Sequence, residues 1–295
     1  MLWFKKQPDS TREAGAAELI EPAELAVALD PQLFLRHLGN LKQTAELDAG
    51  LEPYLESLRA KHQLFFDALN SAAIDALDLA KIELLLEAVF SARRRLFPAL
   101  EQMGEAAAAA AIKTLLYGQG RLQQRMEAFV AAIPVVQGED RESIKAAGKT
   151  RRAAYDFAAE LLHFNAPEQY PLMTRWVWDQ ATVSGALREF IRGNDSMTEI
   201  PLGSSPEMYE GARQWFAAQV GEQGIYRDVP FWIDLVQAQA YADYFRSMAE
   251  GMLSADFGRG GGPEEYLKKF LGIDALRRSG RSRVKHSSDS AGLGE

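Results

Sequence analysis

The chain has 295 residues, of which 47% are apolar and 25% charged, and a formal net charge of −8. This composition is typical of a soluble globular protein and excludes collagen-like and wholly disordered chains. The absence of cysteine excludes disulfides, cysteine nucleophiles, thiolate zinc sites and cysteine-bound iron–sulfur clusters. A reducing compartment is the simplest interpretation, so we expect a cytoplasmic protein that needs no metal or cofactor.

The charge is unevenly distributed along the chain. Between Arg277 and Lys285 five of nine residues are basic, and the remaining residues carry the net negative charge. An acidic body repels nucleic acids at long range, which argues against a nucleic-acid partner. The N-terminus lacks the charged start of a signal peptide, and the longest apolar run, 128–136, has nine residues against the roughly 20 that span a bilayer. We therefore expect no secretion signal and no membrane span.

Apolar residues repeat at helical spacing in almost every segment, and convincing alternating strand patterns are missing. The sequence therefore predicts an all-α fold, a multi-helix bundle of about nine or ten helices. In chain order, helices are expected over residues 22–38, 44–69, 72–103, 105–133, 141–164, 167–182, 185–192, 206–220, 229–253 and 263–271.

A linker is predicted at 134–140, where Pro134 and Gly138 interrupt the helical pattern. The linker would separate two helical subdomains, and the terminal segments outside them lack apolar periodicity. The expected organisation is a disordered N-terminus (1–20), a helical subdomain (21–134), an aromatic-rich helical subdomain (141–275) and a disordered basic tail (276–295).

A basic stretch follows the linker, with no acidic residue between Ser143 and Tyr155. Gly148-Lys149-Thr150 matches the end of a phosphate-binding loop, but Ser143 replaces the first glycine of that motif and no strand precedes it, which argues against an NTPase. Basic side chains near a helix start can still bind a phosphate backbone, although a solvated helix face is the simpler explanation. The phosphate-binding candidates are Lys145, Lys149, Arg151 and Arg152.

Aromatic and polar residues are densest at 155–179, where one helix is expected to end near Phe164 and Pro171 favours an extended residue before it. Polar groups on apolar side chains at such a corner are typical of ligand pockets, and the loop 193–206 could cover one. The alternative is a packed corner in which Arg175 pairs with Asp179 at i, i+4. The candidates for ligand or partner binding are His163, Tyr170, Arg175, Trp178 and Asp179.

Two further expectations concern this corner. Trp176 and Trp178 would lie about 200° apart on a helix, so we expect one to be buried and Trp178 to border solvent, a loop or a partner. Glu160 and His163 have the Glu-x-x-His spacing of di-iron bundles, but the sequence has no second such pair. We therefore expect no metal site.

The clearest heptad pattern lies in 229–253, where Phe231, Leu235, Ala238, Ala242 and Phe245 share one helix face. Small residues on this face let a neighbouring helix approach closely. Core packing within the chain explains the pattern, and a homodimer through this helix is the alternative.

No complete catalytic motif occurs in the sequence, and long amphipathic helices dominate it. We therefore expect a non-catalytic helical adaptor or accessory protein that binds another macromolecule, most simply a protein. A small-molecule-binding protein or enzyme with a pocket at the 163–179 corner is the first alternative. A nucleic-acid phosphate-backbone binder that uses residues 145–152 is the second.

Overall fold

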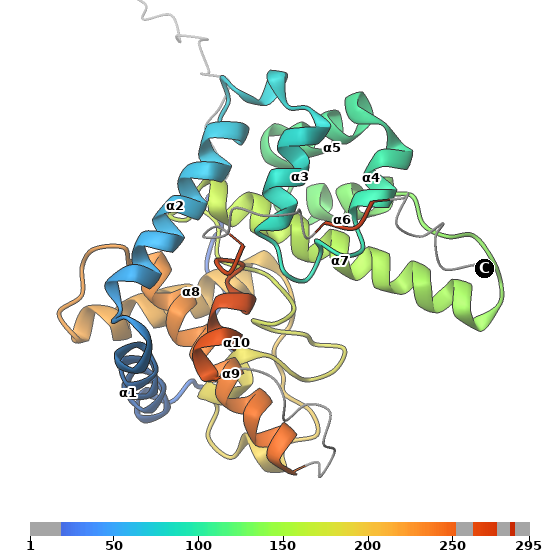
Figure 1. The fold of residues 1–295 in the computed structure, drawn as a ribbon. Coiled ribbons are helices and arrows are strands. Elements are labelled where there is room, and N and C mark those ends of the chain that lie inside the picture. The colour runs from blue at the N-terminus through green and yellow to red at the C-terminus, as the bar shows by residue number, and fades with distance from the viewer. Residues whose placement is uncertain (1–18, 252–261, 276–283, 287–295) are drawn as a thin grey trace, which may run out of the picture.

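The computed structural model describes residues 19–251 (side chains to 248), 262–275 and 284–286 (Figure 1). These residues form ten α-helices and three short 3-10 helices without a β-strand, so the predicted all-α class is confirmed. Within the described ranges no helix combines the length and apolar character needed to cross a membrane. The elements are α1 (Pro31–Asp48), α2 (Glu52–Leu69), η1 (Ile74–Ala76), α3 (Leu79–Glu87), α4 (Phe97–Met103), α5 (Glu105–Tyr117), α6 (Leu122–Ala132), α7 (Arg141–Asn165), η2 (Ala186–Phe190), η3 (Asn194–Ser196), α8 (Pro206–Glu222), α9 (Val229–Gly251) and α10 (Pro263–Phe270).

Local sequence signals determine where the helices begin. The Asp30 carboxylate accepts a hydrogen bond from the backbone N–H of Gln32 and caps α1. Asp140 caps α7 in the same way through two backbone N–H groups, and the Ser205 hydroxyl caps α8. A proline lies in the first turn of α1, α2, α4, α8 and α10, where its missing N–H leaves no intrahelical bond unmade.

The structure corrects several of the expected helices. The helix expected over 22–38 begins only at Pro31, the one expected over 105–133 is divided at 118–121 into α5 and α6, and the segment 185–192 contains a 3-10 helix. The helix expected over 72–103 is divided by turns at 88–96, because Pro98 starts a new helix and the Arg93 guanidinium donates to the carbonyl of Glu87 at the end of α3. The helix expected over 167–182 is wrong. This segment forms turns and one isolated bridge between Asp179 and Ser184, since Pro171 cannot donate within a helix and disfavours a helical residue before it.

Two long helices organise the core. The helix α7 packs against α2, α5 and α6, and α9 packs against α1, α8 and α10. Figure 1 shows α7 running outward from the centre of the molecule beside α6, with α9 and α10 together on the opposite side. Buried side chains from both sides of 134–140 belong to one apolar cluster, and the division into two subdomains stays a prediction. The heptad face of α9 is buried inside the chain at Leu235, Ala238 and Ala242.

The C-terminal part of the chain contributes to this core. Leu267, Leu271 and Ile273 are buried around α10 and the turn that follows it. Of the predicted tail, residues 284–286 are described, and their Val284 side chain is buried. The His286 ring packs edge-on against Phe97 and its Nε2 lies 3.0 Å from a carboxylate oxygen of Glu83, so these three residues pack on α3 and α4. The rest of the tail and the N-terminal 18 residues lie outside the described ranges.

The turn after α10 depends on a glycine. Gly272 has φ +69°, and a Cβ atom there would lie 1.8 Å from the backbone oxygen of Ala88. An L side chain is disfavoured in this conformation, and the close contact is with backbone that cannot rotate away. The absence of a side chain therefore allows the C-terminal segment to pass directly against the turn after α3.

We expect Gly272→Ala to lower the free energy of unfolding by about 2–4 kcal/mol, combining backbone strain with overpacking. Gly224→Ala is the matched control, because Gly224 has φ +75° but open space around its Cα, so only the strain of about 1 kcal/mol remains. Urea unfolding followed by circular dichroism measures both. Equal losses in the two variants would contradict the close-packing explanation.

Candidate functional site

His163, the centre of the predicted corner, is buried in the interior. Its ring is 1% exposed, with Nδ1 2.8 Å from the carbonyl oxygen of Tyr170 and Nε2 2.9 Å from a carboxylate oxygen of Asp234 on α9. Both contacts are within hydrogen-bond distance and hold the ring between the corner and α9. The cavity beside the ring measures about 10 Å³, which admits at most one water. The His163 ring therefore links α7 to Tyr170 of the corner and to α9. The cavity beside it is too small for a ligand.

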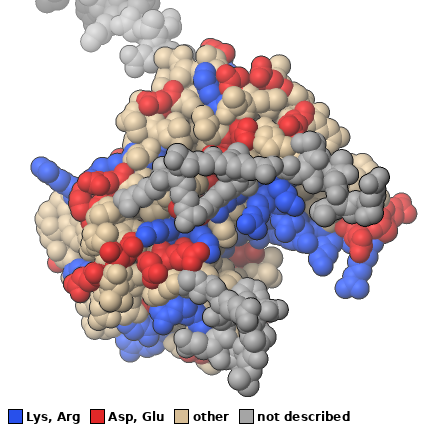
Figure 2. All heavy atoms as spheres, in the orientation of Figure 1, with Lys and Arg blue, Asp and Glu red and all other residues tan. Residues whose placement is uncertain are grey.

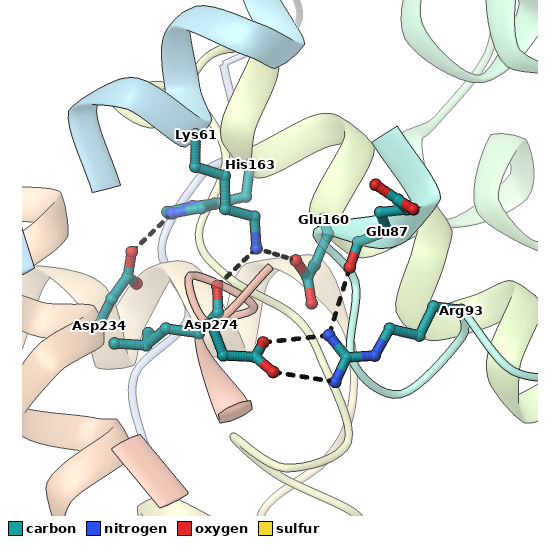
Figure 3. Close-up of polar contacts among 8 residues, drawn as sticks. Lys61, Glu87, Arg93, Glu160, His163, Asp234 and Asp274 are labelled. Atoms are coloured by element: carbon teal, nitrogen blue, oxygen red, sulfur yellow. Dashed lines mark hydrogen bonds and ion pairs between the residues drawn. The ribbon is translucent and has the colours of Figure 1, made fainter. Parts of the chain in front are cut away.

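A second buried ion pair lies next to His163 (Figure 3). The ammonium of Lys61 on α2 is fully buried, 2.5 Å from a carboxylate oxygen of Glu160 and 2.7 Å from the carbonyl oxygen of Leu271, and it lies over the ring of Phe164 at 3.9 Å. These four groups come from α2, α7 and the C-terminal segment. The ammonium thus replaces its lost hydration with one charge, one carbonyl and one aromatic face.

A third buried ion pair joins the C-terminal segment to Arg93, in the turn after α3. The Arg93 guanidinium makes two hydrogen bonds, 3.0 and 3.1 Å long, to the Asp274 carboxylate, as Figure 3 shows. Only 3% of the Arg93 side chain is exposed, so this pair is also largely desolvated. This bidentate contact with the planar guanidinium fixes the position of Asp274. It also fixes the end of the segment that carries Leu271.

Burial shifts the titration of these groups. Burial raises the pKa of Glu160 to about 7, against the opposing effect of the Lys61 charge, and it lowers the pKa of Lys61. Burial also raises the pKa of Asp156, which pairs with Arg175. Strongly shifted groups can mark a reactive site, but structural ion pairs produce the same shifts. In the described ranges, the residues that could ligate a metal form no group of three or more.

Arg175 and Asp179 lie closer to the surface. The Arg175 guanidinium lies 2.9 Å from the carboxylate of Asp156 and 3.6 Å from that of Asp179, and its backbone N–H donates to Asp156. The i, i+4 contact of the packed-corner alternative is therefore present, together with a partner on α7 that the sequence spacing did not indicate. About a third of the Arg175 side chain is exposed, and it faces a hollow.

Trp178 differs from the expectation. It is 1% exposed and Trp176 is 8% exposed, so both are buried and the expected contrast between them is wrong. The angular argument assumed a helix, and the segment instead consists of turns. Trp178 nevertheless lines the same hollow as Arg175, and its indole Nε1–H is buried without a hydrogen-bond partner among the described residues. A buried donor without an acceptor is uncommon in proteins.

The hollow lies between α6, α7 and the corner and has a volume of about 530 Å³. It shares four lining residues with a second hollow of about 540 Å³ that continues to the turn after α6, so the two form one elongated α6–α7 groove. Ser204 and Pro206, where the loop 193–206 ends, line the first hollow. The groove has apolar residues from α6 and its following turn, Met126, Val130, Ile133 and Val135, together with Tyr155 of α7.

The two candidate sets meet in this groove. Arg151 and Arg152, predicted as phosphate-binding, line it together with Arg175, Trp178 and Asp179 of the corner. Neither arginine has a carboxylate within 4.0 Å among the described residues, and both are exposed. Lys145 and Lys149 lie on a different face of α7 and line a separate hollow. His163 and Tyr170 line neither the α6–α7 groove nor this separate hollow.

Sequence reasoning missed the apolar half of the groove. The sequence pattern that indicates this apolar surface lies in 122–136. This segment has more apolar residues than one buried helix face can hold, and Val136 is 57% exposed. Comparisons of the chain with protein-family models, curated proteins and solved structures gave no significant match.

The buried ion pair gives a prediction about stability. Lys61→Met leaves the Glu160 carboxyl and the Leu271 carbonyl without their partner, so we expect the free energy of unfolding to fall by about 3–5 kcal/mol. Replacing both charges, in Lys61→Met/Glu160→Leu, should recover a large part of the loss.

Urea unfolding at neutral pH measures these variants, with Lys113→Met as the control. Lys113 pairs with Asp75 on the surface, where both side chains are at least half exposed, and its loss should cost less than about 1 kcal/mol. Equal effects of Lys61→Met and Lys113→Met would show that the buried pair does not stabilise the fold.

Proposed function

We propose that the protein is a non-catalytic binding protein that holds an acidic, amphipathic segment of a partner protein in the α6–α7 groove. The observation that carries this proposal is the placement of Arg151 and Arg152, two exposed guanidinium groups without a described carboxylate partner, beside an apolar surface. Partner recognition of this kind needs both an apolar anchor and a complementary charge.

The shape of the groove favours a polypeptide segment. Its two continuous hollows extend from the corner along α6 to the turn at 134–137. A partner helix or extended segment that presents apolar side chains on one face would contact Val130 on α6 and Val135 in the turn that follows. Acidic side chains on its flank would then lie within reach of the two arginines.

The charge of the groove supports an acidic partner. Among its charged residues, Asp179 is paired with Arg175, which leaves Arg151 and Arg152 against Glu127. A guanidinium binds a carboxylate through two parallel hydrogen bonds, and this geometry matches the acidic side chains of such a segment. On a body of net charge −8, an acidic partner is attracted only locally, to this surface.

A small anionic ligand is the second candidate, and the inner end of the groove favours it. The Trp178 side chain lines it, and burial raises the pKa of Tyr155 to about 12, so the Tyr155 hydroxyl remains a donor. A hollow of about 530 Å³ falls within the range of small-molecule pockets. An aromatic carboxylate would accept hydrogen bonds from the Tyr155 hydroxyl and from one arginine.

The test uses a fluorescent peptide of about 12 residues that alternates Asp and Glu with Leu and Phe, with binding followed by anisotropy. The variant Arg151→Glu/Arg152→Glu should bind it at least about tenfold more weakly, a loss of about 1.4 kcal/mol. Val130→Ser should also weaken binding, because it removes apolar contact.

The matched control is Lys42→Glu/Arg227→Glu, which makes the same change of charge at exposed residues outside the groove. It should bind within about twofold of the unmodified chain, since distant surface charges are screened. Equal weakening in the two double variants would contradict a site in the groove. Displacement of the peptide by 2-naphthoate, with no effect of Val130→Ser, would favour the small-ligand candidate.

A further inference from the structure

A third hollow, of about 480 Å³, lies on the other face of α7, where the helix meets the turn that leads into α4. Its charged lining residues are Arg94, Arg95, Lys145, Lys149, Lys285 and Glu142. We call this the basic hollow. In Figure 2 the lysine and arginine side chains gather over the outer part of α7, on a molecule whose remaining visible surface mixes both signs of charge.

Three separate parts of the chain supply these cations. Arg94 and Arg95 follow the buried Arg93, which is held by Asp274, and this anchor directs the next two side chains outward. Lys145 and Lys149 are one helical turn apart on α7, which puts their Cβ atoms about 5–6 Å from each other. The backbone N–H of Lys285 donates to the carbonyl of Arg93, so the C-terminal residues 284–286 hold a fifth cation at the same place.

The cations of the basic hollow face few counter-charges. Among the described residues, no carboxylate oxygen lies within 4.0 Å of the four cations from α7 and the 88–96 turn, three of which are exposed. Five positive charges face one negative charge, Glu142, in a single concavity. Like charges held together repel, and concave walls strengthen the local field, so this arrangement favours binding of a multiply charged anion.

The lining indicates which anion. Its uncharged residues include Pro98, Ala146 and Thr150 but no aromatic side chain on which a base could stack. Binding therefore depends on the charge of the anion and the placement of its oxygens, and not on stacking of a base. Adjacent arginines bind phosphate oxygens bidentately, and lysines one turn apart can each neutralise a neighbouring phosphate.

The acidic body limits the size of the anion. Outside the hollow a long polyanion such as duplex DNA would lie against an acidic body, since the whole chain carries −8 even with the five cations of the hollow included. We propose that the basic hollow is a binding site for a compact oligophosphate, an anion with two or more adjacent phosphate groups. Inorganic triphosphate, a nucleoside polyphosphate and a sugar polyphosphate share this chemistry. The site is independent of the α6–α7 groove and of the peptide proposed there.

The experiment titrates the full chain with inorganic tripolyphosphate in an isothermal calorimeter, at low and at physiological salt. The variant Arg95→Gln/Lys149→Gln should bind at least about tenfold more weakly, because it removes one cation from each wall. Lys285→Gln should weaken binding by a smaller factor. The control Lys42→Gln/Arg227→Gln loses the same charge elsewhere and should match the unmodified chain. Circular dichroism and the urea midpoint establish that every variant is folded.

Three further titrations compare tripolyphosphate with a monophosphate, a nucleoside triphosphate and duplex DNA. Monophosphate should bind at least about tenfold more weakly than tripolyphosphate, since it reaches fewer cations. A nucleoside triphosphate and tripolyphosphate should bind alike, because the hollow offers no stacking surface. Equal binding of tripolyphosphate by the hollow and control variants would overturn the site. Tighter binding of a DNA duplex of about 20 base pairs, abolished by Arg95→Gln/Lys149→Gln, would overturn the compact anion in favour of nucleic acid.

Discussion

The ammonium of Lys61 is the constraint on which the interior of this protein depends. A fully buried cation loses several kcal/mol of hydration, and it is tolerated only where other groups replace the lost water. Here a carboxylate from α7, a carbonyl from the C-terminal segment and an aromatic face of α7 do so at distances of 2.5, 2.7 and 3.9 Å. Because each of these groups must be in place, the charge fixes how α2, α7 and the C-terminal segment pack together. The Arg93–Asp274 pair fixes the C-terminal segment against the turn after α3 in the same way. The contact of His163 with Asp234 does so for α7 and α9.

The cations of the chain therefore divide by their partners. Lys61 and Arg93 are buried against carboxylates, and they stabilise the arrangement of the helices. Arg151 and Lys149, only two positions apart on α7, face two different hollows, and neither has a carboxylate oxygen within 4.0 Å among the described residues. A single rigid helix thus presents basic groups on two faces while its inner face carries Glu160 and His163 into the core. Both proposed sites inherit their rigidity from that burial.

The sequence predicted the fold class and the approximate extent of α2 and of α7 to α10, because apolar periodicity, proline at helix starts and capping residues act locally. It failed at 167–182, where turns replaced a helix and the inferred exposure of Trp178 failed with it. The partners of His163, Lys61 and Arg93 were not predictable, since they lie far away in sequence: His163 and Asp234 are 71 positions apart, and Arg93 and Asp274 are 181 apart. Residues 145–152 were identified as basic, but only the three-dimensional arrangement showed that they divide between two hollows.

The distance along the chain between Lys61 and Leu271, 210 positions, also has a consequence for the order of events at the ribosome. Translation proceeds from the N-terminus, and segments begin to fold as they emerge. When α2 and α7 have been made, Lys61 and Glu160 can already meet, but the carbonyl that completes the site does not yet exist. Until then the pair keeps access to water at the gap that the C-terminal segment later fills. The core of a nascent chain consequently stays open to solvent at this point, and final closure waits for the turn at Gly272 to be synthesised and to dock.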